Sequence, residues 1–401
     1  MKKIIYIGND ICINGVYTSV MSDLVVKFKK YADVHYASSN QNIILRMLDM
    51  IYTLLVNSKN CNIVIIDAYS TLNFYYTIII SVISRIIGIP YIVNLHGGDF
   101  PSRLRKNPLL CRLVFNNSSI NVSPSIYLKY HFEKHGFKVK YIPNSINIDN
   151  YKVKYRKSSK FRLLWVRSFH EIYNPQMAIK VVHNLCKSNF NVELCMVGPD
   201  KDGSMEKCKK LAKELGVFEN IYFPGMLMKK EWIKLSNEYD IFINTTDYDN
   251  MPVSIIEAMA LGFPIVSTNP GGIPFLLRDE FDAMLVNKND VNGMVKKITE
   301  ITTSPDLSFT LSKRARRKAE DFSWSEVSIK WEKLLQVYCN QNKIEFLCYR
   351  IGYVFGKNMN NKRLVKKLLL NHKKRKKTKI FNQNLNLNLI HTEDISYLIN
   401  K

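Results

Sequence analysis

Short runs of apolar, mostly β-branched residues recur from the N-terminus to Val286, separated by segments long enough to form a helix. Runs of this length are typical of strands buried on both faces, and their alternation with helical segments predicts parallel sheets built from βαβ units. A first series predicts strands at 3–7, 34–37, 63–67, 91–95, 120–122 and 140–142. A second series predicts strands at 162–166, 193–197, 221–223, 241–244, 264–267 and 283–286.

The polar, charged stretch 149–160 separates the two series and is expected to be an interdomain linker. We therefore predict an α/β protein with two doubly wound, Rossmann-like domains at 1–150 and 160–320. Because ligands of such domains bind at the carboxyl ends of the strands, a central cleft between the domains is expected. An amphipathic helix is expected at 321–340, followed by a basic extension at 341–401.

The most hydrophobic part of the chain, 72–95, is interrupted by polar residues and by Arg85 and Pro90. We expect a buried helix followed by a buried strand here, rather than a membrane span. The opening apolar run ends at Gly8, which favours a first strand over a secretory signal.

Composition adds expectations about compartment and partners. The eight Cys are scattered, with no C-x-x-C pair and no His/Cys cluster, which predicts a reduced cytoplasmic protein without structural zinc. The net charge is +24, and the residues from Lys343 onward contain 14 Lys or Arg against three acids, a local excess of +11. An excess of this size favours anionic partners such as phospholipid or nucleic acid.

The stretch that carries most chemistry runs from Asp249 to Pro274. Pro252 and Gly262 suit the start and end of a short helix. Glu257 is a carboxylate inside that apolar helix, and it must be paired or face a ligand because a lone buried charge is costly. Asp249 lies just outside the helix N-terminus, where free N–H groups and the helix dipole favour a diphosphate. A nucleotide-sugar, with hydroxyls on both sides of a diphosphate, would suit the two acids.

This stretch resembles the donor-site signature of the retaining GT-B glycosyltransferases of family 4. In that signature an acid is followed, after seven residues, by Glu and then by a Gly-Gly-Ile-Pro loop; the first acid here is Asp249, where Glu is commoner. The resemblance covers residues 1–338 and implies a donor site in the second domain and an acceptor site in the first. It also implies that the helix at 321–340 crosses back onto the first domain.

The resemblance further implies roles for the signature residues. Glu257 would bind the donor ribose, and Asp249 would hold the sugar hydroxyls together with Asn250, Met251, Pro252 and Val253. Arg167 ends the first strand of the second domain, and with the helix N-terminus near Ser254 it would stabilise the leaving diphosphate. A surface Arg in a salt bridge is the alternative for Arg167. The family commonly has Lys five residues after this Arg, where this chain has Ile172. Either Arg167 acts alone, or a second cation comes from elsewhere, for example Lys201 or the first domain.

Other strand ends match the family less specifically. His96, with Gly97 and Gly98, closes a first-domain strand, and in similar proteins this His lies near the transferred sugar; a structural His is the alternative. Gly15 stands where the family has a Gly-rich loop near the donor phosphates, although an ordinary turn fits equally. Gly225 and Met226 are expected beside the donor base, or as packing residues.

Two D-x-D sequences, Asp247-Tyr-Asp249 and Asp200-Lys-Asp202, resemble the metal-binding pair of glycosyltransferases with a different fold. In the GT-B interpretation Asp249 faces sugar hydroxyls, so we expect neither a metal nor a cofactor.

We therefore expect a cytoplasmic, retaining, metal-independent hexosyltransferase that uses a nucleotide-diphosphate sugar. Its acceptor would be a glycan or a lipid-linked acceptor, in cell-surface polysaccharide synthesis. The alternatives are a non-catalytic sugar- or nucleotide-binding scaffold, an RNA-associated protein acting through the tail, and, less favoured, a nucleotide-sugar epimerase.

The tail itself has three interpretations. Its basic clusters at 343–379, with apolar neighbours, suit an anionic membrane surface. A solvated or disordered end and electrostatic RNA binding are the alternatives, and no specific nucleic acid is expected.

Overall fold

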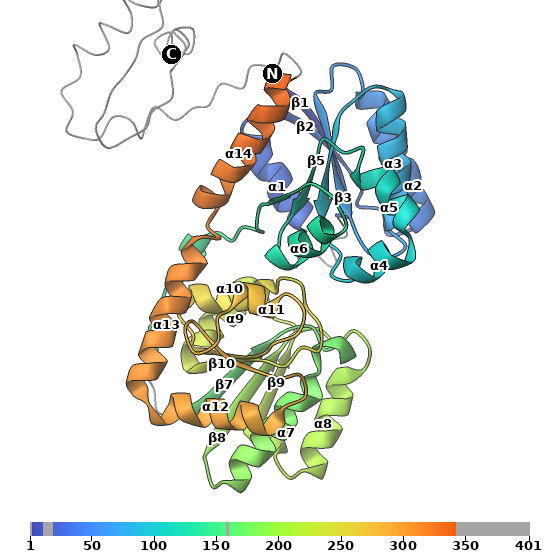
Figure 1. Ribbon diagram of the computed structural model, residues 1–401. Coiled ribbons are helices and arrows are strands. Elements are labelled where there is room, and N and C mark those ends of the chain that lie inside the picture. Colours follow the sequence, from blue (N-terminus) through green and yellow to red (C-terminus); the bar gives the residue numbers. More distant parts are fainter. Residues whose placement is uncertain (1, 11–18, 158–159, 342–401) are drawn as a thin grey trace, which may run out of the picture. The chain divides into compact units, whose positions relative to one another are not determined.

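The computed structural model describes residues 2–10, 19–157 and 160–341, which form two six-stranded parallel sheets flanked by helices (Figure 1). The chain divides into two compact units, Met1–Trp331 and Glu332–Lys401, and both sheets belong to the first. Gly15 and the basic segment 343–379 lie outside the described residues, so what the sequence predicts for them stays a prediction.

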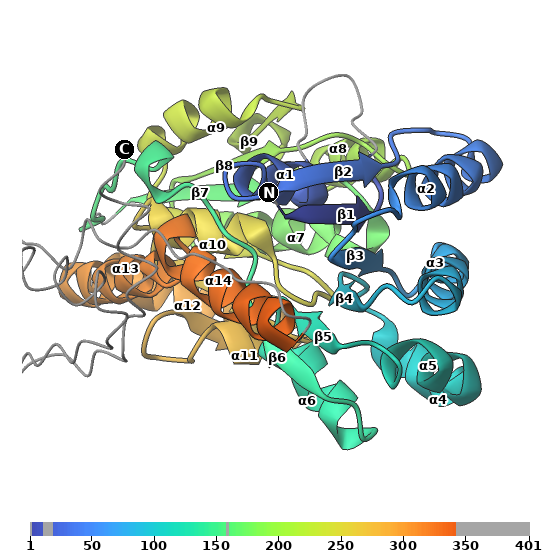
Figure 2. The ribbon, with the colours of Figure 1, turned by 90° about the horizontal axis from the view of Figure 1, so that it is seen from above.

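The N-terminal sheet has the strand order β2-β1-β3-β4-β5-β6. Its strands are β1 (Lys3–Ile7), β2 (Asp33–Ala37), β3 (Ile63–Ala68), β4 (Tyr91–Leu95), β5 (Ile120–Ser123) and β6 (Val139–Tyr141). Its helices are α1 (Val20–Phe28), α2 (Ile43–Asn57), α3 (Phe74–Ile86), α4 (Phe100–Lys106), α5 (Pro108–Phe115) and α6 (Ile126–Lys134). Figure 2 shows α2, α3 and α5 in one layer along the same face of the sheet. On the opposite face, Phe28 of α1 stacks on Tyr6 of β1, with ring centroids 6.5 Å apart.

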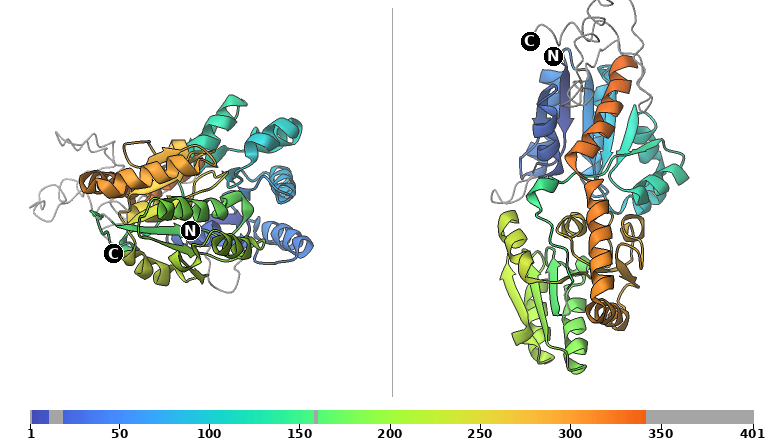
Figure 3. Two further views of the ribbon diagram at one scale, coloured as in Figure 1. Left: turned by 90° about the horizontal axis from the view of Figure 1, so that it is seen from below. Right: turned by 90° about the vertical axis from the view of Figure 1, so that its left-hand side faces the viewer.

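The C-terminal sheet has the strand order β12-β11-β10-β7-β8-β9. Its strands are β7 (Phe161–Val166), β8 (Val192–Val197), β9 (Ile221–Gly225), β10 (Ile241–Asn244), β11 (Ile265–Thr268) and β12 (Met284–Val286). Its helices are α7 (Pro175–Lys187), α8 (Ser204–Glu214), α9 (Lys229–Leu235), α10 (Val253–Ala260), α11 (Ile273–Leu276), α12 (Val291–Thr303) and α13 (Pro305–Glu320). The last helix, α14 (Trp324–Gln341), returns to the N-terminal half, where the Trp331 ring packs edge-on against Phe28 of α1 with centroids 5.4 Å apart. Single 3-10 turns lie at Ile148–Asn150, Glu171–Tyr173, Phe218–Asn220 and Ser236–Glu238. Each sheet lies between layers of helices (Figure 3).

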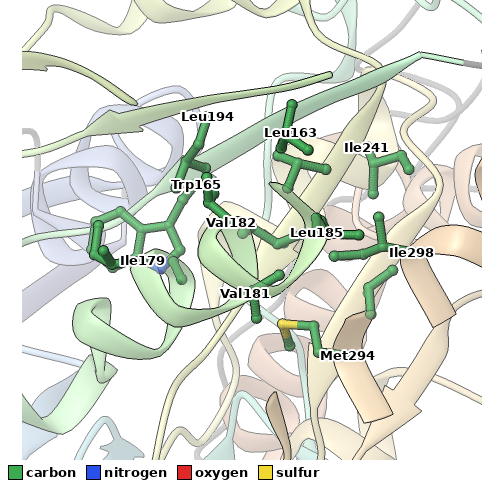
Figure 4. Close-up of a cluster of buried hydrophobic side chains, with 14 of the residues drawn as sticks. Leu163, Trp165, Ile179, Val181, Val182, Leu185, Leu194, Ile241, Met294 and Ile298 are labelled. Carbon is green, nitrogen blue, oxygen red and sulfur yellow. The ribbon is translucent and has the colours of Figure 1, made fainter. Parts of the chain in front are cut away.

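The core of the C-terminal half shows why β7 is fixed in position. Leu163 and Trp165 of β7 pack against Ile179 and Leu185 of α7, and Met294 of α12 closes the cluster (Figure 4). Burying each such side chain contributes roughly 1.5–3 kcal/mol. The strand that ends at the functional site is therefore held by well-packed apolar contacts.

All twelve predicted strands are present, with bounds that differ by at most two residues. The helix predicted within 72–95, α3, is only partly buried, although the sequence predicted a buried helix. Tyr75 and Ile86 of α3 are 51% and 78% exposed, so only one face of this helix is covered. The apolar composition of the segment did not reveal this, because periodicity cannot show whether a second face has a partner.

The stretch 149–160, predicted to be an interdomain linker, contains a buried arginine. Arg156 is 2% exposed, and its guanidinium donates hydrogen bonds to the backbone carbonyls of Lys154, Ser236, Tyr239 and Leu261. A buried cation is tolerated only when its donors are satisfied in this way. Burial lowers the pKa of Arg156 to about 9.

Candidate functional site

A cavity of about 650 Å³ is lined by both halves of the first unit. Asn94 of β4 contributes from the N-terminal half, and Arg167, Lys229, Ser254 and Glu257 contribute from the C-terminal half. Asn94 and Arg167 stand at the carboxyl ends of their strands, where parallel sheets bind ligands. The cavity therefore occupies the place that the sequence predicted for the cleft.

Arg167 is the cation at the end of β7. Its guanidinium forms an ion pair with Asp249, lies 3.4 Å from the hydroxyl of Ser254 and sits over the ring of Tyr173, 4.2 Å from the ring centroid. The Nε–H of Arg167 is buried and has no hydrogen-bond partner among the described residues. Buried donors are almost always paired, so this one marks a place where a ligand oxygen fits.

The Gly-Gly loop holds Asp249 in place. A β-carbon at Gly272 would lie 1.7 Å from the carbonyl oxygen of Asn250, and one at Gly271 would lie 2.3 Å from that of Asp249. The backbone N–H of Gly272 donates to the same Asp249 carbonyl at 2.8 Å. Only glycine permits this close approach, which explains the pair of glycines at the end of the signature.

Glu257 is the buried carboxylate of α10. It is 6% exposed; its Oε1 accepts a hydrogen bond from the Tyr151 hydroxyl at 2.8 Å and forms an ion pair with Lys229 Nζ at 2.7 Å. Burial, together with the charge of Glu257, raises the pKa of Tyr151 well above its usual value. The requirement that this carboxylate be paired is therefore met by a residue of α9 and a residue of the segment before β7.

The N-terminus of α10 opens onto the cavity through Val253 and Ser254. The first N–H groups of a helix lack partners within the helix and carry its positive pole. Together with Arg167 and Lys229 they make this wall of the cavity suited to an anion.

His96 lies in a buried polar network of the N-terminal half. Its Nε2 is 2.9 Å from Asp67 Oδ1, which also accepts hydrogen bonds from the Tyr6 hydroxyl at 2.9 Å and the Asn94 amide at 3.1 Å. The His96 ring stacks on Tyr69, with centroids 5.5 Å apart. Asn94 lines the cavity from this network. A role for His96 in transfer stays a prediction.

The remaining predicted residues lie at other positions. Asn250 and Met251 line a second cavity of about 260 Å³. Asn250 also hydrogen-bonds Ser125 of the N-terminal half, and the Tyr248 hydroxyl donates to the Gly98 carbonyl. Gly225 accepts a hydrogen bond from the Gly198 N–H beside the end of β7. Pro252 caps α10, Gly97 packs on Ser70, and Met226 is 40% exposed after β9.

Lys229 and Tyr151 were missed by sequence reasoning. The missing family Lys was sought at Lys201, which is exposed on the loop after β8, whereas Lys229 lines the cavity. A signal existed, because Lys229 follows the strand end at Gly225 that the sequence had already associated with the donor. Asp67 ends a predicted strand and could have been found in the same way.

The acids of the two D-x-D sequences are engaged by other groups. Asp247 lies 3.6 Å from Lys288 Nζ, Asp249 pairs with Arg167, and Asp202 accepts from the Glu171 N–H. Across the described ranges, no group of three His, Cys, Asp or Glu side chains is arranged as a metal site.

The second half of the chain resembles known proteins in sequence. Residues 147–318 match the family described as glycosyl transferases group 1. An uncharacterised glycosyltransferase of Methanocaldococcus jannaschii is 23% identical over 60% of this chain and 66% of its own length. The putative colanic acid biosynthesis glycosyltransferase WcaL of Escherichia coli is 26% identical over 37% of each chain. The alignments thus span less than two thirds of these relatives.

Solved structures resemble the whole two-sheet region. HepE of Anabaena, determined in complex with UDP, has a TM-score of 0.67 at 15% identity, covering 84% of this chain and 100% of HepE. Sucrose-phosphate synthase of Thermosynechococcus elongatus has a TM-score of 0.69 at 12% identity, covering 85% of this chain and 100% of that structure. Likeness at this identity establishes the fold, which is GT-B. Residues 147–318 are therefore similar in sequence to the group 1 glycosyl transferases, within a chain whose fold is GT-B.

Proposed function

We propose that this protein transfers a hexosyl unit from a nucleotide-diphosphate sugar, with retention of anomeric configuration and without a metal. The observation that carries the proposal is the pairing of both signature acids with cations at one cavity. Arg167 pairs with Asp249, and Lys229 pairs with Glu257. A cavity with two cations and a helix N-terminus on one wall is suited to a diphosphate.

Donor binding would exchange these ion pairs. A diphosphate competes with the carboxylates for the guanidinium of Arg167 and the ammonium of Lys229, and its oxygens can accept from the orphan Nε–H of Arg167. The exchange frees Asp249 to accept from sugar hydroxyls and Glu257 to accept from ribose hydroxyls. Lys229 thus supplies the second cation that the family usually places five residues after Arg167.

In the proposed reaction, the enzyme acts by positioning and by electrostatic stabilisation. Arg167, Lys229 and the first turn of α10 stabilise the charge that develops on the leaving diphosphate. The leaving phosphate accepts the proton of the acceptor hydroxyl on the same face of the sugar, which gives retention without a protein nucleophile. The N-terminal half supplies the facing wall through Asn94, with His96 and Asp67 behind it.

The donor base and the acceptor class are proposed from relatives. HepE was crystallised with UDP, which makes uridine the first base to test. WcaL is named for colanic acid biosynthesis, and an E. coli relative, 20% identical over 59% of this chain, is named for galactosyl transfer to a diphosphoundecaprenol-linked sugar. These names support a glycan or lipid-linked acceptor and cell-surface polysaccharide synthesis.

Thermal-shift binding of a nucleotide-sugar panel tests the donor site. We expect one donor to raise the stability of the wild type by roughly 2.7 kcal/mol at a hundredfold excess over Kd. Glu257→Ala should lose this shift, whereas Glu193→Ala, an exposed glutamate on β8, should keep it. No shift with any donor, from a folded wild type, would contradict the proposal.

Two further measurements test metal independence and retention of anomeric configuration. Nucleoside diphosphate release should persist in EDTA, and the product's anomeric proton coupling should match that of the donor. Donor binding without transfer to any glycan or lipid-linked acceptor would instead indicate the non-catalytic scaffold.

A further inference from the structure

Helix α2 is apolar on both of its faces. Its inner face buries Met50 and Leu54 against the N-terminal sheet. Its outer face exposes large apolar side chains to solvent: Ile43, Ile44, Leu45, Leu48, Tyr52, Leu55 and Val56. A surface helix normally has a polar outer face, so a helix that is apolar all round indicates that its outer side has a partner.

The corresponding helices of the C-terminal half differ. None of the residues of α7, α8 or α12, all fully described, is an exposed large hydrophobic residue. Exposed residues of α7 and α8 include Lys180 and Lys207. The apolar outer side of α2 is therefore a property of one half and not a general feature of this chain.

The apolar surface continues onto α3, which packs against α2. Tyr75 near the start of α3 and Ile86 at its end are exposed, and α3 contains Arg85 as its single charged residue. We define the α2–α3 outer face by Ile44, Leu48, Tyr52 and Leu55 of α2 and by Tyr75 and Ile86 of α3. Both helices lie in the layer seen in Figure 2.

Cations border this face. Lys59 follows the end of α2, and Arg85 lies in the last turn of α3. Arg112 belongs to α5, which packs on α3, and Arg105 and Lys106 belong to α4, which packs on α5; all five cations are exposed. The acids from 43 to 115 are fewer: Asp49 is half-buried, Asp67 is buried inside the sheet and Asp99 is exposed. An apolar centre with a basic border is complementary to a lipid bilayer whose headgroups are anionic.

We propose that the α2–α3 outer face docks on an anionic lipid bilayer surface. The helix has 15 residues and is therefore about 22 Å long, enough to lie along the interface with its apolar side towards the acyl chains. Within the ranges that the structure describes, no helix has the length and hydrophobicity needed to cross a membrane. Attachment by this face would thus be peripheral.

Charge argues against two other occupants. A second copy packed face to face would bring the basic borders of both copies together, and like charges at an interface are costly. The chain's own C-terminal segment carries the local excess of +11 and would be repelled by the same border. An anionic bilayer satisfies the apolar centre and the basic border together.

The cavity would stay accessible in the docked protein. Val93 and Leu95 of β4 belong to the core beneath α2 and α3, and side chains alternate along a strand, so Asn94 between them points to the other face of the sheet. Asn94 is the β4 residue that lines the donor cavity. Bilayer docking therefore does not depend on catalysis, and the two can be tested separately.

Vesicle flotation of the full-length chain tests the proposal. Wild type should float with vesicles of phosphatidylcholine and phosphatidylglycerol, and much less with phosphatidylcholine alone. Leu48→Gln/Leu55→Gln should weaken partition by about tenfold, because two buried apolar side chains are lost from the bilayer contact. Lys59→Gln/Arg85→Gln should weaken binding to the anionic vesicles only. The control Tyr222→Gln/Phe309→Gln removes exposed apolar residues from the C-terminal half and should bind as wild type.

Three results would overturn the proposal. The first is unchanged flotation of Leu48→Gln/Leu55→Gln, including the case in which substituting Lys373–Lys377 by Gln abolishes it instead. The second is a wild type that does not bind anionic vesicles. The third is a wild type that is dimeric by light scattering while the α2 variant is monomeric, which would identify a protein interface. Unchanged thermal midpoints show that each variant is folded, and flotation needs no donor or acceptor.

Discussion

The two halves share six parallel strands but differ in what their crossover helices expose. In α7 of the C-terminal half, Ile179, Val182 and Leu185 are buried, and the outward positions are polar. In α2 of the N-terminal half, both sides are apolar. The sheet dictates only the inner side of a crossover helix. The outer side depends on what it faces. In α7 it faces solvent and is polar, whereas in α2 it is apolar, and we propose that it faces a bilayer.

The halves also differ in how they place charge. The C-terminal half presents two ion pairs, Arg167–Asp249 and Lys229–Glu257, to the cavity. The N-terminal half contributes a carboxylate, Asp67, that is buried among hydrogen-bond donors beneath the wall. Charge that faces the cavity is available for exchange with an anionic ligand, whereas the buried network is suited to holding side chains in place.

Removing the cation at the end of β7 should have the largest effect. Arg167→Met is expected to lower kcat/KM by roughly a hundredfold to a thousandfold, because an electrostatic group at the leaving diphosphate is lost. Steady-state kinetics with the identified donor measure this change. Arg317→Met, which removes an exposed arginine of α13, should have no effect, and an equal loss in both variants would refute the assignment.

Two buried arginines allow a comparison of stability between the halves. Arg156→Met should lower the free energy of unfolding by about 3–5 kcal/mol, because four carbonyls, three of them in buried hydrogen bonds, lose their charged donor. Arg46→Met in the N-terminal half should cost less, since Arg46 donates to two carbonyls and one side-chain oxygen. Urea unfolding measures both, and a larger loss for Arg46→Met would contradict the expectation.

A buried leucine of α7 and an exposed leucine of α2 test how much the inner and outer sides of these helices contribute to stability. Leu185→Ala in α7 should cost about 2–5 kcal/mol, because Leu185 is fully buried. Leu48→Ala in α2 should change the free energy of unfolding by less than about 0.5 kcal/mol, because Leu48 is 57% exposed. A large loss for Leu48→Ala in dilute solution would mean that its side chain packs within the protein.

The smallest expected effect concerns alkaline pH. Tyr151 has a raised pKa in the folded protein, first because of burial and then because of Glu257. Above about pH 10 the unfolded chain ionises this tyrosine while the folded protein keeps its proton, so the free energy of unfolding falls as pH rises. Tyr151→Phe should make this decline shallower in urea unfolding from about pH 9 to 11. An unchanged slope would mean that Tyr151 ionises equally in both states.

The sequence predicted the strands and the signature residues, because local patterns in the chain determine both. The strands are present because β-branched runs favour buried parallel sheets. Arg167 and Glu257 line one cavity, and Asp249 pairs with Arg167, because a contiguous signature and a strand end fix these residues. Lys229 escaped prediction because its pairing with Glu257 depends on how two loops approach in space.

The sequence also did not predict the burial of Arg156 or the exposure of the outer side of α2. The burial of Arg156 was missed because charged stretches are usually solvated, and its carbonyl partners are distant in sequence. The open side of α2 was missed because an apolar segment does not reveal which of its faces another element covers.

A crystal structure with a bound nucleoside diphosphate would show directly whether the donor binds as proposed. We expect the diphosphate at the N-terminus of α10, within hydrogen-bonding distance of Arg167 and Lys229, with the Arg167–Asp249 and Lys229–Glu257 pairs opened. A nucleotide bound elsewhere, or bound here with both ion pairs intact, would contradict this proposal.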